Sequence, residues 1–416
     1  MKRFKTIIGI LSALIVCAVV FTSCAGASVS DINVLADQEL DTDAAEVNMG
    51  SVISYSFDNV MQMRKYVPAQ KNASVLLKGY YYTSDGGGGM FYWDGESTLE
   101  HDGGLVIAPN DAEKGRYIRI CESDYRNVKW FGALGSGSNN DTDAIRKAIA
   151  SLPPSGGTVY FPGGTYCIND TINIGNGDGE GVRSDYNGIK LLGCGCSIRA
   201  TRDIDVMISI NGRICDVVID GIDIYANQLA KTCILARAVN SLRISNLAVS
   251  MFTECGLHLI GGKTNGNGNV NCTFESVNSV SIVNNVICVL IDGDATTCPT
   301  ENCRFIDSRF DVHTTAGSMA TLIRNAHSID FYRCHFAGYN DEESEYLVLE
   351  ATADGSPYGI TYYDCSVKRI KVIEENGNSI GDSFFYGYGT YDLEDLPDHP
   401  RLHGITDSGM PFQIGG

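Results

Sequence analysis

The sequence predicts an all-β fold, a parallel β-helix whose first coil is preceded by one short α-helix. Similar strand-forming phrases recur after Tyr166, and their starts lie about 25 to 31 residues apart. A second apolar run follows each of the first five phrases, and no helical pattern intervenes. Repeats of this length bury a continuous core only when neighbouring coils stack, so equivalent strands should pair in parallel. The phrases span 217–224, 242–249, 271–279, 302–310, 329–337 and 360–368.

The expected helix lies between Trp130 and Tyr166. Asp141 or Asn140 can accept the free amides of its first turn, and a Pro-Pro-Ser-Gly-Gly break follows it. Its apolar residues recur at helical spacing, at Ala144, Ile145, Ala148, Ile149 and Leu152. One apolar face is therefore available to cover the first coil.

The same segment carries a family resemblance. It resembles the first motif of the pectate lyase superfamily, the group that includes family-28-related glycosidases and rhamnogalacturonase-like and epimerase-like proteins. The matching residues are Phe131, Gly132, Ala133, Gly135, Gly137, Asp141, Thr142, Ala144, Ile145, Gly156, Gly157, Thr158, Val159, Phe161, Pro162, Gly164 and Tyr166. The chain departs from the motif at Trp130, Ser136 and Asn140, where acids are usual. The resemblance implies a single-stranded, right-handed parallel β-helix that acts on polysaccharide, although a fold by itself does not fix the reaction.

The N-terminus predicts export. Lys2, Arg3 and Lys5 precede an apolar run over 6–21, and Phe-Thr-Ser-Cys at 21–24 resembles a bacterial lipobox with Cys24 as the lipidated residue. An ordinary secretory signal is the alternative. We expect an extracytoplasmic protein that is lipid-anchored to the bacterial cell envelope and contacts the membrane through that lipid only.

Composition shifts divide the chain into five segments. Ahead of the β-helix, aromatic strands on either side of a glycine-rich turn at 77–93 resemble the small β head found in phage tailspikes. Such turns can cradle phosphate, but no Gly-Lys-Ser/Thr follows this one. By the tailspike analogy a trimer is conceivable, and the sequence leaves the oligomeric state open. The expected segments are a signal peptide (1–23), a flexible acidic tether (24–51), the β head (52–125), the β-helix (126–375) and an irregular C-terminal cap (376–416).

Charge restricts the partners. The formal net charge is −19, and loss of residues 1–23 removes three of 31 cations and none of 50 acids, which leaves −22. This balance argues against nucleic acid. An acidic glycan would need a local basic strip or bound cations.

Cysteine usage leaves the disulfide state open. Without Cys17 and Cys24, 13 of the 15 cysteines remain, an odd number that cannot pair completely. A closely spaced pair, Cys194 and Cys196, has no second pair to complete a metal site. Four cysteines recur every 31 residues and are expected to be small buried thiols: Cys272, Cys303, Cys334 and Cys365.

The candidate catalytic residues come from aligning the second strands of the coils. This alignment places Arg237, Gly261, Asp292, Arg324 and Glu350 in one column. Neighbouring coils stack about 4.8 Å apart, so a carboxylate, a guanidinium and a carboxylate should occupy successive rungs.

Three interpretations of this column stay open. Asp292 and Glu350, about 9.6 Å apart by stacking, could be the acid and base of an inverting glycosidase. In a lyase, Arg324 or Lys263 could be the base, and Asp292 with Asp294 could hold calcium, a possible cofactor. The column could also be an exposed ladder of ion pairs.

The first strands predict a second column with substrate-binding potential. It contains Asp223, Ala248, Asn278, Arg309, His335 and Ser366. The predicted substrate-binding residues are Lys263, Arg309, His335, Asp311 and His313. Phe310 and Tyr332 are nearby candidates for stacking on sugar rings.

Together these features predict a surface-anchored polysaccharide lyase or glycoside hydrolase that acts on an acidic, uronate-containing glycan. The alternative is a β-helix that binds glycan without cleaving it, like an adhesin or tailspike. The coil region has no Gly-His-Gly or Asn-Thr-Asp element, which argues against polygalacturonase activity in the strict sense.

Overall fold

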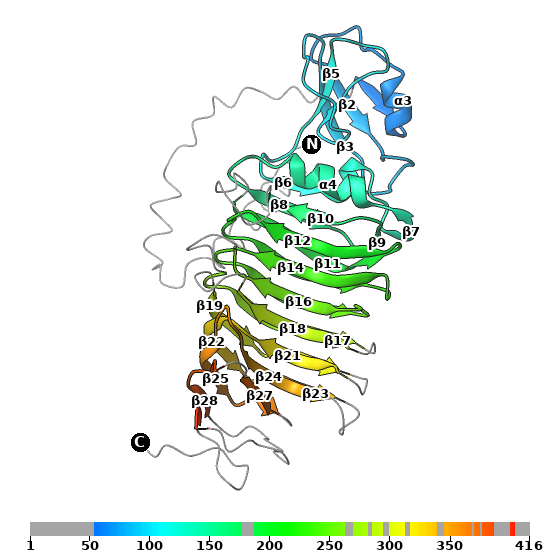
Figure 1. Ribbon diagram of the computed structural model, residues 1–416. Helices are drawn as coiled ribbons and strands as arrows, with labels where there is room; N and C mark the ends of the chain where they lie inside the picture. Colours follow the sequence, from blue (N-terminus) through cyan, green and yellow to red (C-terminus); the bar gives the residue numbers. More distant parts are fainter. Residues whose placement is uncertain are drawn as a thin grey trace, which may run out of the picture. The chain divides into compact units, whose positions relative to one another are not determined.

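The computed structural model is a solenoid of parallel strands with few helices (Figure 1), which confirms the predicted fold class. The expected signal peptide and tether, Cys24 included, lie outside the described residues. None of the described helices has the length and apolar character that a membrane crossing needs. The structure describes residues 54–175, 187–262, 269–281, 285–293, 299–312, 317–338, 345–367, 370–374, 377–386 and 400–403.

Two sheets form the walls of the solenoid. The smaller sheet is built from the five predicted second strands, two earlier strands and one later strand: β10 (Ile172–Ile174), β12 (Ile204–Asn211), β14 (Ala230–Arg237), β16 (Cys255–Ile260), β18 (Ile287–Asp292), β21 (Met319–Ile323), β24 (Glu345–Ala351) and β27 (Ile370–Glu374). The larger sheet contains the predicted first strands: β6 (Tyr125–Asn127), β8 (Gly157–Phe161), β11 (Ile189–Ala200), β13 (Val218–Tyr225), β15 (Arg243–Ser250), β17 (Thr273–Ser281), β19 (Thr300–Ile306), β22 (Ala326–Tyr332), β25 (Tyr358–Tyr363), β28 (Ser383–Tyr386) and β29 (Leu402–His403). All pairs within these two sets are parallel.

The later coils contain a third, short strand that the sequence did not predict. These strands are β20 (Arg309–Val312), β23 (His335–Gly338) and β26 (Ser366–Val367), and they pair with one another in parallel. In the first coils, β7 (Ser136–Asn140) and β9 (Gly164–Ile168) occupy the corresponding edge of the larger sheet. Each later coil therefore has three strands and a sharp corner within what looked like one phrase.

Residues in the left-handed backbone region form the corners. Asn271, Asn302 and Ser328 have φ of 57°, 54° and 55° just before the core positions of β17, β19 and β22. At the next corner Asp307 and Arg333 have φ of 48° and 50°. Asn and Asp tolerate this conformation better than most residues, so the polar residues between apolar runs fix where each coil turns.

The interior contains a continuous stack of aromatic rings. Phe274, Phe305, Phe331, Tyr362 and Phe385 occupy successive rungs, with ring centroids 4.5 to 5.0 Å apart and planes within 13°. All five are fully buried. Stacked rings add to the free energy of burial, so this column ties the later coils together.

The four cysteines spaced by 31 residues are buried thiols, as expected, but they form two columns. Cys272, just before β17, aligns with Cys303 within β19, as the pairing of Thr273 with Arg304 requires. Cys334 and Cys365 instead lie at the later corner, one residue before the paired His335 and Ser366. A constant spacing did not mean a constant position, because the third strand adds residues unevenly to each coil. No disulfide joins cysteines in the described ranges.

Helix α4 (Thr142–Ala150) covers the first coil with the predicted apolar face. Asp141 is the N-cap residue, but the first amide of the helix, that of Thr142, donates to Asn140 Oδ1 at 3.2 Å. The buried Asp141 carboxylate instead accepts the amides of Leu134 and Gly135. The Gly-Ser turn of the family motif is thereby tied to the helix start.

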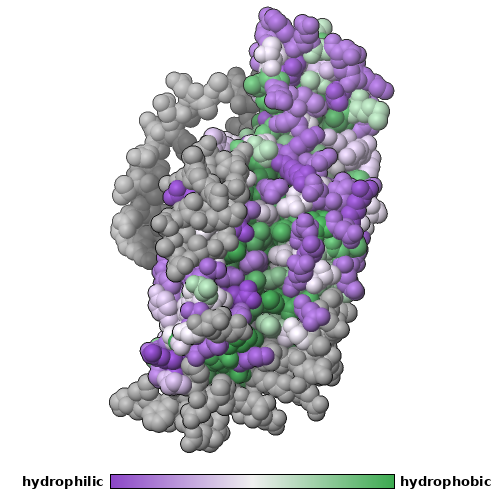
Figure 2. All heavy atoms as spheres, in the orientation of Figure 1, coloured by the Kyte–Doolittle hydropathy of each residue, from purple (hydrophilic) through white to green (hydrophobic). Residues whose placement is uncertain are grey.

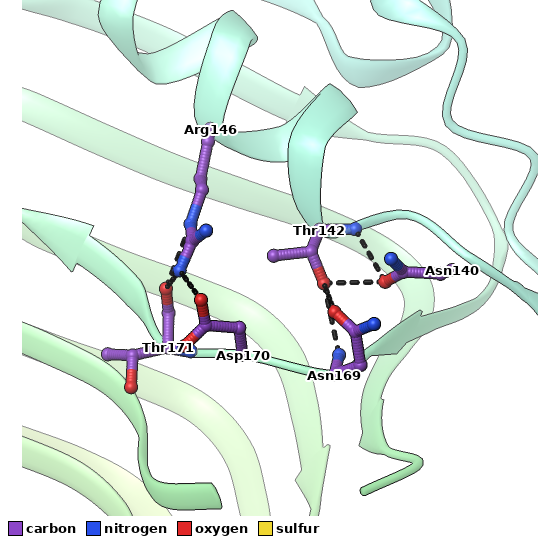
Figure 3. Close-up of polar contacts among 6 residues, drawn as sticks. All are labelled: Asn140, Thr142, Arg146, Asn169, Asp170 and Thr171. Carbon is purple, nitrogen blue, oxygen red and sulfur yellow. Dashed lines mark hydrogen bonds and ion pairs between the residues drawn. The ribbon is translucent and has the colours of Figure 1, made fainter.

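Two further contacts hold α4 on the solenoid (Figure 3). Thr142 Oγ1 accepts the Asn169 amide at 3.0 Å. Arg146 points toward the next turn, where it donates to the Thr171 carbonyl and pairs with Asp170 at 2.8 Å.

The β head is a five-stranded sheet in the order β1–β2–β3–β5–β4, with a short helix, α3 (Val60–Arg64). Its strands are β1 (Tyr55–Phe57), β2 (Ser74–Leu77), β3 (Gly89–Asp94), β4 (Val106–Ile107) and β5 (Arg116–Arg119). The glycine-rich turn before β3 is structural. Asp85 accepts the amides of Tyr80, Tyr81, Tyr82 and Gly87, so these donors do not face a phosphate.

A buried guanidinium connects this turn to the solenoid. Arg119 donates to the carbonyls of Gly87, Gly88 and Gly104. It also lies between the rings of Phe91 and Trp130, at 4.5 and 4.7 Å. Burial lowers its pKa to about 10, which still leaves it cationic at neutral pH.

The solenoid extends beyond residue 375, where we expected an irregular cap. Strand β28 pairs in parallel with β25, and β29 pairs with β28. Phe385 continues the interior ring stack. The repeat was missed because its corner residues are less regular there; most of 387–416 lies outside the described residues.

Candidate functional site

The predicted catalytic residues lie where the strands of the smaller sheet end. Strand pairing aligns Ile291, Ile323 and Leu349 on successive rungs. The next residue of each strand is therefore Asp292, Arg324 or Glu350. These three residues are called the Asp–Arg–Glu cluster below.

The guanidinium of Arg324 lies between the two carboxylates. Its Nε donates to Glu350 Oε2 at 2.5 Å, and its Nη1 lies 3.6 Å from Asp292 Oδ2. The side chains are 18%, 36% and 23% exposed for Asp292, Arg324 and Glu350. Partial shielding from water strengthens such contacts, and the cluster still keeps an open side.

Burial raises the pKa of Asp292 above the usual value for an aspartate. The Gly293 amide, which donates to Asp292 Oδ1 at 2.8 Å, and the Arg324 charge act in the opposite direction but do not outweigh burial. Asp292 is thus easier to protonate than an aspartate in water. A carboxyl of this kind can give up a proton during a reaction.

An apolar row accompanies the cluster on the same face of the sheet. Residues two positions earlier share a face in a strand, so Leu290, Leu322 and Val348 lie beside Asp292, Arg324 and Glu350. Figure 2 shows apolar side chains gathered over the middle of this sheet. Leu322 and Val348 are buried, and Leu290 is partly exposed, so only part of this apolar row is accessible beside the charged groups.

One rung of the predicted column was misaligned. Arg237 pairs with Ile260, and Ile260 pairs with Asp292, so Gly261 lies one position beyond the column. Aligning strands by their last apolar residue gave the wrong register there. Sequence reasoning also overlooked His258, which lies in the apolar row between Leu235 and Leu290.

The calcium and lyase-base predictions depend partly on Asp294 and Lys263, which lie outside the described residues. Among the residues that are described, no three acidic, histidine or cysteine side chains converge as metal ligands. Calcium binding by Asp292 with Asp294 stays a prediction.

The second predicted column has the expected register. Asn278 pairs with Arg309, Arg309 with His335, and His335 with Ser366. Arg309 is the first residue of β20, and Arg324 follows the last residue of β21. The length of β20 and β21 therefore separates Arg309 from the Asp–Arg–Glu cluster along the coil.

Two residues near this column are less accessible than expected. The Asp311 side chain is 3% exposed and accepts from Arg309 Nε at 2.5 Å. Phe310 is fully buried against Phe305 and Phe336, so the expectation that it stacks on sugars is wrong. His313 lies outside the described residues, and Tyr332 does face outward.

A polar hollow that sequence reasoning missed lies on the outer face of the larger sheet. It has a volume of about 300 Å³ and is called the outer hollow below. Its lining residues are Asn271, Thr273, Asn302, Arg304, Ser328 and Asp330. The signal was present in the repeated Asn-Cys-Thr-Phe and Asn-Cys-Arg-Phe phrases, which we used only to define coils.

Comparison with known proteins places this architecture in a family. The family described as rhamnogalacturonase A/epimerase, pectate lyase-like matches residues 125–361. The chain belongs to this family. The head matches a second family, the phage tail protein small four-stranded β-sheet domain, over residues 56–122. The resemblance drawn from the first motif is therefore confirmed.

Curated relatives match short parts of the chain. Mannuronan C5-epimerase AlgE3 of Azotobacter vinelandii is 40% identical over 88 residues, 21% of this chain and 4% of the epimerase. Alginate lyase 7 of the same organism is 34% identical over 110 residues, 23% of this chain and 12% of the lyase. A Mu-like prophage defective tail fiber protein of Haemophilus influenzae is 28% identical over 142 residues, 33% of this chain and 22% of that protein. The chain thus spans a small part of the length of these relatives.

Solved structures share the fold. The tailspike protein gp49 of Acinetobacter baumannii bacteriophage Fri1, a capsular polysaccharide depolymerase, superposes with a TM-score of 0.58 at 13% identity. The match covers 84% of this chain and 69% of the tailspike. The tailspike of Acinetobacter phage vB_ApiP_P1 gives the same TM-score at 14% identity, over 82% of this chain and 61% of that one.

Proposed function

We propose that this protein is a glycoside hydrolase that cleaves an acidic glycan at the bacterial surface. The observation that carries the proposal is the Asp–Arg–Glu cluster, in which one guanidinium holds two carboxylates of different environment on alternate rungs. Membership of the family and the epimerase and lyase relatives named for mannuronan and alginate support a uronate-containing substrate.

The geometry fits the inverting reaction best. Strands two rungs apart are separated by about 9.6 Å, and both carboxylates reach toward the guanidinium between them, which is compatible with the roughly 6.5 to 9.5 Å separation that leaves room for a water. Asp292, whose pKa burial raises, is the proposed acid: its protonated form donates the proton to the glycosidic oxygen as the bond to the anomeric carbon breaks. Glu350 accepts a proton from the water whose oxygen forms the new bond to that carbon. Proton exchange with solvent then restores both groups.

Arg324 is a positioning and binding residue in this mechanism. A guanidinium is in general a poor base, and that of Arg324 contacts both carboxylates. It can orient Glu350 or pair with a uronate carboxylate of the substrate.

A lyase is the second candidate, favoured by the alginate lyase relative. In that reaction a base removes the proton beside the uronate carboxylate, and the leaving glycosidic oxygen departs as a double bond forms. Of the two predicted lyase bases, Arg324 is a poor base and Lys263 lies outside the described residues, so the described geometry ranks hydrolysis first.

We also propose that the protein is exported and anchored through Cys24. The support is the lipobox-like sequence at 21–24, together with the tail and tailspike relatives. Whether tailspike-like copies assemble into a trimer is a separate proposal that rests on analogy of fold alone.

The first prediction tests the reaction with Asp292→Asn and Glu350→Gln on alginate and polygalacturonate. We expect new reducing ends without unsaturated uronate, and a loss of about 10²- to 10⁴-fold in rate for each variant. Asp307→Asn is the matched control, because it removes a carboxylate that contacts Arg333 at 2.6 Å at another corner.

Unsaturated products would favour the lyase. Turnover that survives both substitutions would overturn the role of the cluster. Binding to either polymer without any cleavage product would instead favour a non-catalytic, tailspike-like module.

A further inference from the structure

We propose that the outer hollow is a second glycan-binding site, separate from the Asp–Arg–Glu cluster, and that it binds neutral sugar units without cleaving them. The hollow lies on the larger sheet, whereas the cluster belongs to the smaller one. The proposal does not depend on the identity of the reaction at the cluster.

Six outward side chains on three successive rungs line the hollow. Thr273 pairs with Arg304, and Arg304 with Asp330, so these three form one row. The left-handed corner residues form the row two positions earlier, and they are Asn271, Asn302 and Ser328. Two amides, two hydroxyls, a guanidinium and a carboxylate therefore converge on one space of about 300 Å³.

This set suits the hydroxyl pairs of a sugar. Each sugar hydroxyl both donates and accepts, and Asn side chains offer both functions in one planar group. Arg304 Nε lies 3.8 Å from Asp330 Oδ2, longer than a hydrogen bond, and the Arg304 side chain is 63% exposed. Its donors can therefore turn toward a ligand at little cost.

Stacked aromatic rings flank the hollow on both sides along the strands. On one side the His327 and Tyr358 rings stack at 4.6 Å and 16°, and Tyr358 is 50% exposed. On the other side Tyr332, Tyr363 and Tyr386 stack over three rungs, with centroids 4.6 and 5.3 Å apart. The Tyr332 hydroxyl reaches Asp330 at 3.4 Å. Within each stack the ring faces cover one another, so the terminal rings provide the faces that can take the C–H face of a pyranose unit.

The charges favour a neutral ligand. The lining has one cation and one anion, and Glu301 adds a carboxylate beside it, 3.2 Å from His327 Nε2. A polyuronate or phosphate chain would meet no excess of positive charge here. A second copy of this chain is also a poor fit, because interface cores are depleted in charged groups and this surface is polar.

The test measures retardation in gels that contain dextran, galactomannan or polygalacturonate. Glu350→Gln serves as the parent so that cleavage cannot change the polymer during the run. Arg304→Ala and Tyr358→Ala are introduced into this parent, and we expect each to raise the dissociation constant for a neutral polymer at least tenfold. Arg243→Ala is the matched control, because Arg243 occupies the same row one rung before Thr273 and does not line the hollow.

The outcomes separate this proposal from the proposed function. Loss of neutral-polymer retardation in both hollow variants, with retention in the control and unchanged thermal unfolding, supports the site. No retardation by either neutral polymer, or equal retardation of all variants, overturns it. A change in the sedimentation coefficient of Arg304→Ala also overturns the proposal, because it would identify the hollow as an interface between copies of the chain. None of these results depends on whether Asp292 and Glu350 cleave a glycan.

Discussion

At the residue scale, the environment of Asp292 distinguishes the two carboxylates of the cluster. Leu290 precedes Asp292 on the same face, and burial raises the pKa of Asp292. Glu350 instead receives the close Nε–H of Arg324 at 2.5 Å. Two carboxylates in unlike environments can take opposite roles in acid–base catalysis.

The second prediction concerns the pH dependence of cleavage. Because Asp292 must donate a proton and its pKa is raised, activity is expected to persist above the usual aspartate range and to fall as pH rises through the raised pKa. Rate profiles of the unaltered protein and of Asp307→Asn should share this alkaline decline. A decline that persists unchanged in the residual activity of Asp292→Asn would assign it to another group.

At the element scale, the ring stack is the feature that links the later coils. Phe305 is fully buried between Phe274 and Phe331, and it contacts Phe310 edge-on. The Phe305 side chain, on β19, therefore contacts residues of three other strands, β17, β20 and β22. Removing this ring would leave a cavity that neighbouring rungs cannot fill, because strand pairing fixes their spacing.

The third prediction is that Phe305→Ala lowers the free energy of unfolding by about 3 to 5 kcal/mol. Ile306→Ala, at the next residue but on the half-buried outer face, should cost clearly less. Urea denaturation of both variants measures the difference. Equal losses would mean that the ring stack adds nothing beyond the general packing of β19.

At the scale of the whole molecule, position relative to a surface matters because the net charge is −19. A free protein of this charge would be repelled by a polyanionic substrate. An anchored protein stays at the envelope even when its net charge repels the substrate. A single lipid chain gives only marginal, reversible membrane binding. A bacterial lipoprotein anchor carries several chains and therefore binds the membrane stably.

The fourth prediction is that the full chain partitions into the detergent phase of a temperature-induced phase separation and that Cys24→Ala moves it to the aqueous phase. Cys121→Ala is the control, because Cys121 is an exposed cysteine of the head. Aqueous partition of the unaltered chain would favour the ordinary secretory signal.

The sequence by itself determined the coil architecture and much of the cluster. Apolar phrases, polar corner residues and the first motif are local features, so they can be read without knowing what each coil contacts. Asp292, Arg324 and Glu350 aligned correctly because their strands end in similar apolar pairs.

Only the tertiary structure decided the register at Ile260, the burial of Asp311 and Phe310, the two cysteine columns and the outer hollow. Coils of unequal length place residues of equal spacing in different columns, and a one-residue shift moves a side chain to the other face of a sheet. Which polar residues meet across rungs depends on that register. The hollow is made by three coils at once, so the repeated Asn-Cys-x-Phe phrases indicate it only once their register is known.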